Sequence, residues 1–92
     1  MNYIKVKWNH LLPDEPVWLY SELDAERWET RKVEIFADGS RGYASATESG
    51  GETRLGEAPI PPLINISYDP QFEPVEITKE EFEEVWSKRK GE

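Results

Sequence analysis

The chain contains no cysteine and only one histidine among its 92 residues. Without cysteine it can form no disulfide, no thiolate nucleophile and no cysteine-based metal site, and this composition fits a reducing cytosol. No apolar run approaches the roughly 20 residues that a transmembrane helix requires. The first residues, Met1–Lys5, include neither a basic n-region nor an apolar h-region, so we expect no signal peptide. These absences predict a cytoplasmic protein without a membrane partner.

Basic residues are also scarce. The chain has 11 Lys and Arg residues against 19 Asp and Glu residues, which gives a formal net charge of −8. Such an acidic chain repels nucleic acid and anionic lipid unless a basic patch is segregated on one face. It suits a basic protein partner instead. The alternative explanation is that the excess acid simply keeps the protein soluble.

Aromatic residues are plentiful, with four Trp, four Tyr and three Phe. Charge together with this aromatic content indicates a folded domain with a core rather than disorder. A chain of 92 residues forms one domain, which we place at residues 1–92. A domain of this size buries only about 60–65% of its unfolded surface, so we expect marginal stability.

The first half of the chain predicts several strands. Apolar and polar residues alternate with a period of two, as in half-buried strands, within Tyr3–His10, Val17–Glu22 and Trp28–Ala37. Asp38–Gly42 contains an Asp and two glycines, and this composition favours a reversal into a returning strand at Tyr43–Thr47. Further along, residues 48–54 form either a flexible connection or a second turn. The prolines of residues 55–62 favour an extended path, and Leu63–Ile66 is expected to pack against the sheet as an edge strand.

The clearest helix signal lies near the C-terminus. Thr78 is the N-cap and Glu81 its partner in a capping box, and the basic residues 88–90 match the helix dipole in the last turn. Phe82 and Trp86 share one stripe, and Gly91 follows the end of the helix. The sequence therefore predicts an α+β fold, an antiparallel sheet of four to five strands with one C-terminal α-helix packed on one face.

A single helix can cover only one face of this sheet. In the long strand, the row expected to face the helix is Val33, Ile35 and Ala37. The opposite face is expected to be partly open and to carry Tyr3, Lys5, Lys7, Lys32 and Glu34, with Trp18 and Tyr20 if the second strand pairs in that register. We expect the other tryptophans, Trp8, Trp28 and Trp86, in the core, which leaves Trp18 as the interface aromatic.

Several motifs resemble a small bacterial family with no assigned function. They read YIKVKW, EPV with LYSELD, RKVEIF with DG and GYA, then LGE, DP, FEP and the Glu81–Phe82 helix, and so span nearly the whole chain. The motifs are specific to that family but carry no recognisable chemistry. Families of this size and style often include immunity proteins encoded beside polymorphic toxins. The resemblance therefore implies a toxin as the partner.

Catalytic chemistry has little support in the sequence. His10 could form a site with Asp14 and Glu15, but the spacing matches no metal motif. A strand-end histidine that hydrogen-bonds to a loop is the simpler explanation. There is no nucleophile elbow, no phosphate-binding glycine loop and no zinc-ligand spacing. We predict no catalytic residue, no metal site and no cofactor. The alternative is a small enzyme or ligand-binding domain that uses the open sheet face with His10 and nearby carboxylates.

A further alternative is a sheet face that binds single-stranded nucleic acid, since Tyr3 and the lysines would share the predicted open face. The net charge argues against this alternative. The leading hypothesis is a non-enzymatic protein-binding module and, as the resemblance implies, an immunity protein that blocks a basic toxin domain. Its predicted partner-binding residues are Trp18, Tyr20, Glu22, Asp24, Glu26, Glu29, Lys32 and Glu34.

Overall fold

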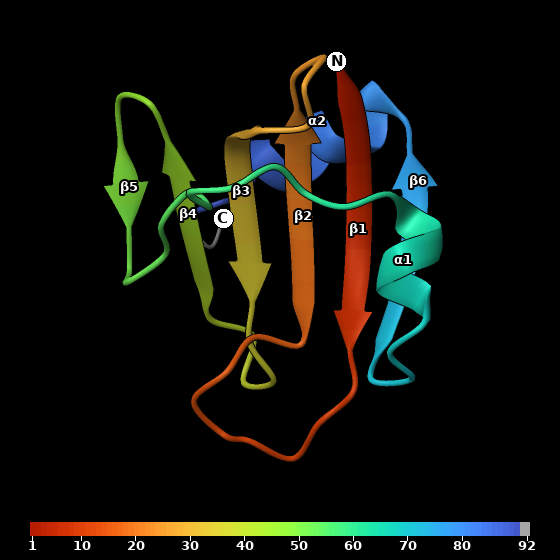
Figure 1. Cartoon of the computed structure of the whole chain (residues 1–92). Helices are drawn as coiled ribbons and strands as arrows, with labels where there is room; N and C mark the ends of the chain where they lie inside the picture. Colours follow the sequence, from red (N-terminus) through yellow and green to blue (C-terminus); the bar gives the residue numbers. More distant parts are fainter. Residues whose placement is uncertain (91–92) are drawn as a thin grey trace.

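A computed structural model describes residues 1–90 as a six-stranded antiparallel sheet covered on both faces (Figure 1). The strands are β1 (Asn2–Trp8), β2 (Trp18–Leu23), β3 (Glu29–Ile35), β4 (Arg41–Ser45), β5 (Ser49–Gly50) and β6 (Phe72–Ile77), in the order β5-β4-β3-β2-β1-β6. The helices are α1 (Leu63–Ser67) and α2 (Lys79–Ser87). The α+β class, the antiparallel sheet and the C-terminal helix are confirmed, but residues 1–90 form six strands instead of four to five, and two helices instead of one.

The second half of the chain differs from the prediction. Leu63–Ile66, expected as an edge strand, lies in α1, and β6 forms where a loop was expected. Pro70 and Pro74 suggested a loop in this part of the sequence. In the structure, however, Pro74 lies within β6 and pairs with Val6. Because β6 is the outermost strand of the sheet, Pro74 needs no N–H donor on its open side. The sheet therefore gains a strand that the local sequence argues against.

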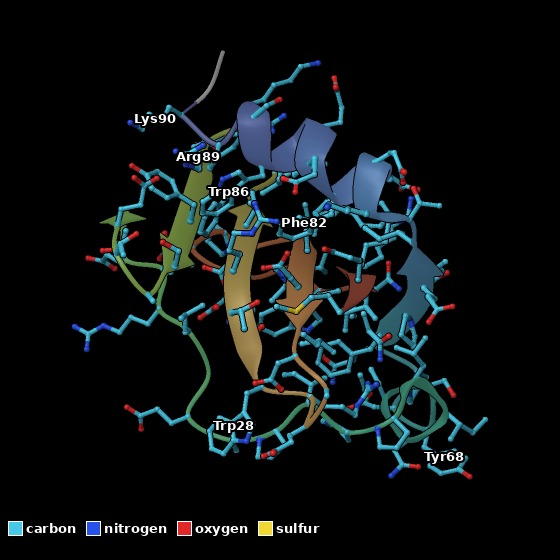
Figure 2. All side chains as sticks on the ribbon, turned by 90° about the horizontal axis from the view of Figure 1, so that it is seen from above. Trp28, Tyr68, Phe82, Trp86, Arg89 and Lys90 are labelled. Carbon is cyan, nitrogen blue, oxygen red and sulfur yellow. The ribbon has the colours of Figure 1, made fainter. Side chains whose placement is uncertain are left out.

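One face of the sheet packs against α2. The buried cluster on this face consists of Tyr3, Ile77 and Phe82, and the ring centroids of Tyr3 and Phe82 lie 5.4 Å apart. Figure 2 shows Phe82 and Trp86 pointing from α2 toward the sheet. Their spacing of four residues places them on one side of the helix, where their rings stack at 6.3 Å. The predicted apolar stripe of this helix is therefore the core contact.

The predicted caps of α2 form in part. The Thr78 side chain accepts a hydrogen bond from the Glu81 backbone N–H at 3.1 Å. The Glu81 carboxylate forms an ion pair with Lys5 at 3.1 Å, which ties the first turn to β1. The helix ends at Ser87, so the basic residues 88–90 follow the last turn instead of lying in it. The expected stop at Gly91 lies outside the described residues.

The other face is covered by residues 54–62, here called the strap, and by α1. Figure 1 shows both in front of the sheet, with α2 behind it. The buried cluster on this face consists of Ile4, Val6 and Leu23. The side chains packed over it are half-buried: Leu19, Ile60, Leu63, Ile66 and Phe72. The sheet therefore has a second, thinner cover that the sequence did not predict.

The strand register corrects the predicted open face. Lys5 pairs with Tyr20, and Tyr20 pairs with Val33, so these residues share the α2 face with Tyr3. Lys32 and Glu34 point to the strap face instead. Alternation within one strand divides its side chains into two rows. It does not show which row of the neighbouring strand lies on the same face of the sheet. The predicted open face combined rows from opposite sides of the sheet, and both sides are partly covered.

Two predicted core positions are also wrong. Ala37, expected in the row that faces the helix, lies beyond the end of β3 and is exposed. Trp28 keeps 38% of its surface exposed, and Figure 2 shows it on the side away from α2. Of the row predicted to face the helix, Val33 is fully buried and Ile35 half-buried.

Candidate functional site

The predicted partner-binding residues do not lie together in the structure. Trp18 and Tyr20 lie on the α2 face, whereas Lys32 and Glu34 lie on the strap face. Asp24 and Glu26 lie in the connection between β2 and β3. Glu22 and Glu29 are buried, with 7% of each residue exposed.

Glu22 belongs to an ion pair that joins the sheet to α2. Arg31 donates from Nε to Glu22 Oε1 at 2.9 Å and from Nη2 to Oε2 at 2.6 Å. The same guanidinium donates two hydrogen bonds of 2.9 Å to Glu83 on α2. It also lies 4.9 Å from the ring centroid of Phe82 and 5.1 Å from that of Trp86. The hydrogen bonds from Arg31 lower the pKa of Glu22 to about 2, so this carboxylate is charged at neutral pH.

Asp24 closes the connection between β2 and β3. Its Oδ1 accepts hydrogen bonds from the backbone N–H groups of Glu26 and Trp28, both at 2.9 Å. Arg27, between them, has a positive φ of 68°, which a non-glycine residue rarely adopts. Glu26 is exposed on this turn. Asp24 therefore has a structural role, and Glu26 remains a surface carboxylate.

Glu29, Lys32 and Glu34 anchor the strap and the residue before it. The Gly56 backbone N–H donates to Glu29 Oε1 at 2.7 Å, and the Ser21 hydroxyl donates to Glu29 Oε2 at 2.7 Å. Lys32 Nζ lies 3.4 Å from Glu29 Oε1 and donates to the Arg54 carbonyl at 3.3 Å. The Thr53 hydroxyl donates to Glu34 Oε1 at 2.7 Å. The sequence offered no structural role for Lys32 and Glu34, but with Glu29 they form the polar contacts beneath the strap.

Arg27 holds the far end of the strap. Its guanidinium donates to the Ile60 carbonyl at 2.7 Å and to the Pro61 carbonyl at 2.8 Å. The Ile60 backbone N–H donates back to the Arg27 carbonyl at 2.8 Å. These contacts fix the strap where it crosses the sheet before α1.

Replacing Arg27 with alanine is expected to loosen the strap. Two charge-assisted hydrogen bonds disappear, so we expect a loss of about 1–3 kcal/mol in the free energy of strap opening. Amide hydrogen exchange should accelerate at Ile60 far more than at Val33 in β3. The control is Arg54→Ala, because it removes an exposed guanidinium while keeping the Arg54 carbonyl that Lys32 uses. Unchanged protection of the Ile60 amide in Arg27→Ala would contradict this role.

A pocket of about 480 Å³ opens between the strap, α1 and the sheet. Its floor includes Ile4, Val6 and Leu19, and its sides include Ile60, Ile66 and Phe72. A few polar groups lie among these apolar side chains: Ser21, Glu29, Lys32, Asn65 and Asp69. Pockets for small molecules and side chains commonly have this composition and a volume of about 300–1,000 Å³. We call this cavity the strap pocket.

An acidic groove of about 290 Å³ adjoins the strap pocket. The carboxylates that line it are Asp14, Glu15, Glu34 and Glu52, and its lining within residues 1–90 includes one cation, Arg54. Glu34 of the groove is directly paired across the sheet with Leu19 of the pocket floor. Directly opposed residues have Cβ atoms about 5 Å apart, so the groove and the pocket are neighbours on one face.

His10 is held by the loop that follows β1. Its Nδ1 accepts a hydrogen bond from the Leu12 backbone N–H at 2.9 Å, so Nε2 carries the proton and donates to the Pro16 carbonyl at 2.8 Å. The adjacent hollow, in the described part of the chain, is lined by no carboxylate; its residues are Lys7, Trp8, Asn9, His10, Leu11 and Val17. No group of three or more His, Asp or Glu residues that could hold a metal ion occurs within residues 1–90.

Trp18 and Tyr20 form an aromatic pair on the part of the α2 face nearest β1. Their ring centroids are 6.3 Å apart, and the ammonium groups of Lys5 and Lys7 lie 5.5 and 6.0 Å from the Trp18 ring. Lys5 is already paired with Glu81, which reduces the positive charge of this surface. The surface has the aromatic and basic composition of a nucleic-acid site, but a weak net charge.

The match to a family model covers almost the entire chain. The family is described as a domain of unknown function (DUF6881), and its model matches residues 2–91. The chain belongs to the DUF6881 family. No curated protein and no solved structure matches it. The expectation of a family without an assigned function is confirmed.

In this DUF6881 domain, the strap face is the best candidate for binding. It combines an open apolar pocket with an adjoining group of carboxylates, whereas Glu22, Asp24 and Glu29 are used in internal contacts. Sequence reasoning named Asp14 and Glu15 only as possible partners of His10 and missed Glu52, because the groove residues come from two distant loops. Leu63 and Ile66 are three residues apart, as on one face of a helix, and two prolines precede them. This pattern was the signal that could have indicated α1 and its pocket. No helix in residues 1–90 is long and apolar enough to cross a membrane.

Proposed function

We propose that this DUF6881 domain is a non-enzymatic protein-binding module of the cytoplasm whose partner is a basic protein. The observation that carries the proposal is the acidic groove beside the strap pocket. A basic toxin domain that a bacterial immunity protein blocks is the partner class that the sequence resemblance implies. Blocking would require only tight contact with the basic surface of the toxin, without any chemical step.

The groove carboxylates are suited to a partner because they have few internal roles. Among residues 1–90, no ion pair involves Asp14, Glu15 or Glu52. The buried carboxylates Glu22 and Glu29 are, by contrast, fully engaged by neighbouring groups. Carboxylates that cluster near a low-dielectric surface create a strong local potential, and the net charge of −8 adds to it. Such a field steers a basic protein toward this face and repels an acidic one.

A binding role also agrees with the state of the titratable groups. General acid–base catalysis needs a group whose pKa lies near neutral pH. Hydrogen bonds from Arg31 lower the pKa of Glu22 to about 2 and also lower the pKa of Glu83. His10 uses both ring nitrogens in the loop that holds it. These groups are arranged for structure, and they support a binding module better than an enzyme.

Neutralising the groove is expected to weaken partner binding strongly. The variant Asp14→Asn/Glu15→Gln/Glu52→Gln should lower the association rate for the product of the adjacent gene by about 10-fold or more at low salt. Its matched control, Glu26→Gln/Glu76→Gln/Glu80→Gln, changes the net charge equally at exposed sites outside the groove. Surface plasmon resonance at two salt concentrations measures both rates. Equal losses in the two variants would mean that the groove has no specific role.

The immunity role has its own test. Cells that express the product of the adjacent gene are expected to stop growing unless this protein is co-expressed, and the two proteins should co-purify. Normal growth without this protein would refute the immunity role. The binding experiment would still decide whether the acidic groove recognises a basic protein of another kind.

A further inference from the structure

We propose that the strap pocket and the acidic groove together bind one extended segment of the partner protein. A bulky apolar side chain of this segment occupies the strap pocket, and a Lys or Arg two residues further on occupies the acidic groove. This inference rests on the proposed function, because it names the partner segment that the binding face recognises.

The pocket has apolar surface to offer. None of residues 63–67 in α1 is buried, and the strap and α1 side chains Ile60 and Ile66 are only half-buried over the sheet. A side chain that enters from the partner would cover the floor formed by Ile4, Val6 and Leu19. A large aromatic ring has the most apolar area to bury there, about 150–250 Å². The pocket therefore favours an aromatic or long aliphatic anchor.

The distance between pocket and groove sets the spacing of the segment. Lys32 lines the pocket and Glu34 lines the groove, and these residues lie on the same face two positions apart in β3. Two residues of a strand span about 6.6 Å, and an extended peptide rises by about 3.3 Å per residue. A segment that lies along β3 would therefore present its anchor and its basic residue with one residue between them.

The charges of this face select a basic segment over an acidic one. The Lys32 ammonium is occupied by Glu29 and by the Arg54 carbonyl, so it is not available to an incoming carboxylate. Asp69 lines the pocket, and the groove adds Asp14, Glu15 and Glu52 against a single cation within residues 1–90, Arg54. The same charges disfavour a symmetric contact between two copies of this chain, because two acidic grooves would meet, and the net charge of −8 makes two copies repel each other. A basic segment of a different protein is the occupant that complements this face.

Three short peptides test the proposal by nuclear magnetic resonance on the full chain. The probes are acetyl-Trp-Gly-Arg-amide, acetyl-Ala-Gly-Arg-amide and acetyl-Trp-Gly-Glu-amide. The first is expected to shift the methyl signals of Ile4, Val6 and Leu19 together with the amide signals of Glu34 and Thr53. It should bind at least about tenfold more tightly than either of the other two, a difference of about 1.4 kcal/mol.

A pair of variants on α1 tests whether the apolar anchor of the peptide occupies the strap pocket. Asn65 and Ile64 are both exposed on α1, but Asn65 lines the strap pocket and Ile64 does not. Asn65→Trp is expected to occupy the pocket mouth and to weaken binding of the Trp-Gly-Arg peptide by about tenfold or more. Ile64→Trp adds the same ring beside the pocket and should leave the affinity nearly unchanged. Equal effects of the two variants would overturn the assignment of the pocket.

The peptide results separate this inference from the proposed function. If the Ala-Gly-Arg peptide binds as tightly as the Trp-Gly-Arg peptide, the groove recognises basic groups but the pocket has no anchor, and this inference falls alone. If the Trp-Gly-Glu peptide binds as tightly, the selection for a basic residue fails, and the proposed function loses its support as well. The absence of methyl shifts at Ile4, Val6 and Leu19 with the Trp-Gly-Arg peptide would also overturn the inference.

Discussion

Replacing Arg31 with alanine is expected to lower the free energy of unfolding by about 3–5 kcal/mol. Arg31 of β3 forms ion pairs with Glu22 of β2 and Glu83 of α2, and so links these three elements. It forms two hydrogen bonds with Glu22 and two with Glu83, and its side chain is only 20% exposed. In the variant, the Glu22 side chain, which is 9% exposed, would remain buried and charged without its main partner.

The loss of stability in Arg31→Ala has a second cause besides the broken ion pairs. The guanidinium lies over the rings of Phe82 and Trp86, so its removal also leaves space in the contact between α2 and the sheet. Domains of this kind have a total stability of about 5–15 kcal/mol, and a 92-residue chain is expected near the lower end. We therefore expect Arg31→Ala to be partly unfolded at 37 °C.

Two further variants serve as comparisons for the loss of stability expected in Arg31→Ala. Lys88→Ala removes the cation of an ion pair with Glu84 in which the side chains are 52% and 64% exposed, so it should cost less than about 0.5 kcal/mol. Glu83→Gln leaves the ion pair between Arg31 and Glu22 intact. Its loss in the free energy of unfolding should therefore lie between those of Lys88→Ala and Arg31→Ala. Urea unfolding followed by tryptophan fluorescence measures all three. A loss below about 1 kcal/mol in Arg31→Ala would show that this ion pair is not a major source of stability.

Acidification is expected to destabilise the protein by about 3 kcal/mol through Glu22 alone. The pKa of Glu22 is about 2 in the folded protein, against an ordinary value of 4.5. A carboxylate with a lowered folded pKa binds its proton more readily in the unfolded chain. Its contribution is therefore complete above about pH 4.5 and is lost progressively as the pH falls toward 2. The lowered pKa of Glu83 adds a loss in the same direction.

The variant Glu22→Gln isolates this contribution. It cannot ionise, so its stability should depend less on pH than that of the parent protein. The two proteins should differ most near pH 7, and the difference should shrink as the pH falls from about 4.5 to 2. Urea unfolding at several pH values measures this difference. A constant difference across this range would mean that Glu22 is not the group that titrates.

The sequence predicted the elements whose signals are local. The strands β1 to β4 follow from period-two alternation and from a glycine-containing turn, because each strand exposes one row and buries the other. The start of α2 follows from Thr78, whose side chain accepts from the Glu81 backbone as expected. The stripe of Phe82 and Trp86 likewise gave the buried side of this helix.

Only the tertiary structure decided which rows share a face and what covers them. Lys32 and Glu34 read as an outward row, but each forms a hydrogen bond with a residue distant in sequence, 22 residues away in Arg54 and 19 residues away in Thr53. The strand β6 depends on pairing with β1, which overrides the local preference of Pro74. The strap pocket and the acidic groove depend on the same long-range contacts, because loops that are distant in sequence meet over the sheet. Composition fixed the acidic character of the chain, and the register of the sheet decided where the carboxylates gather.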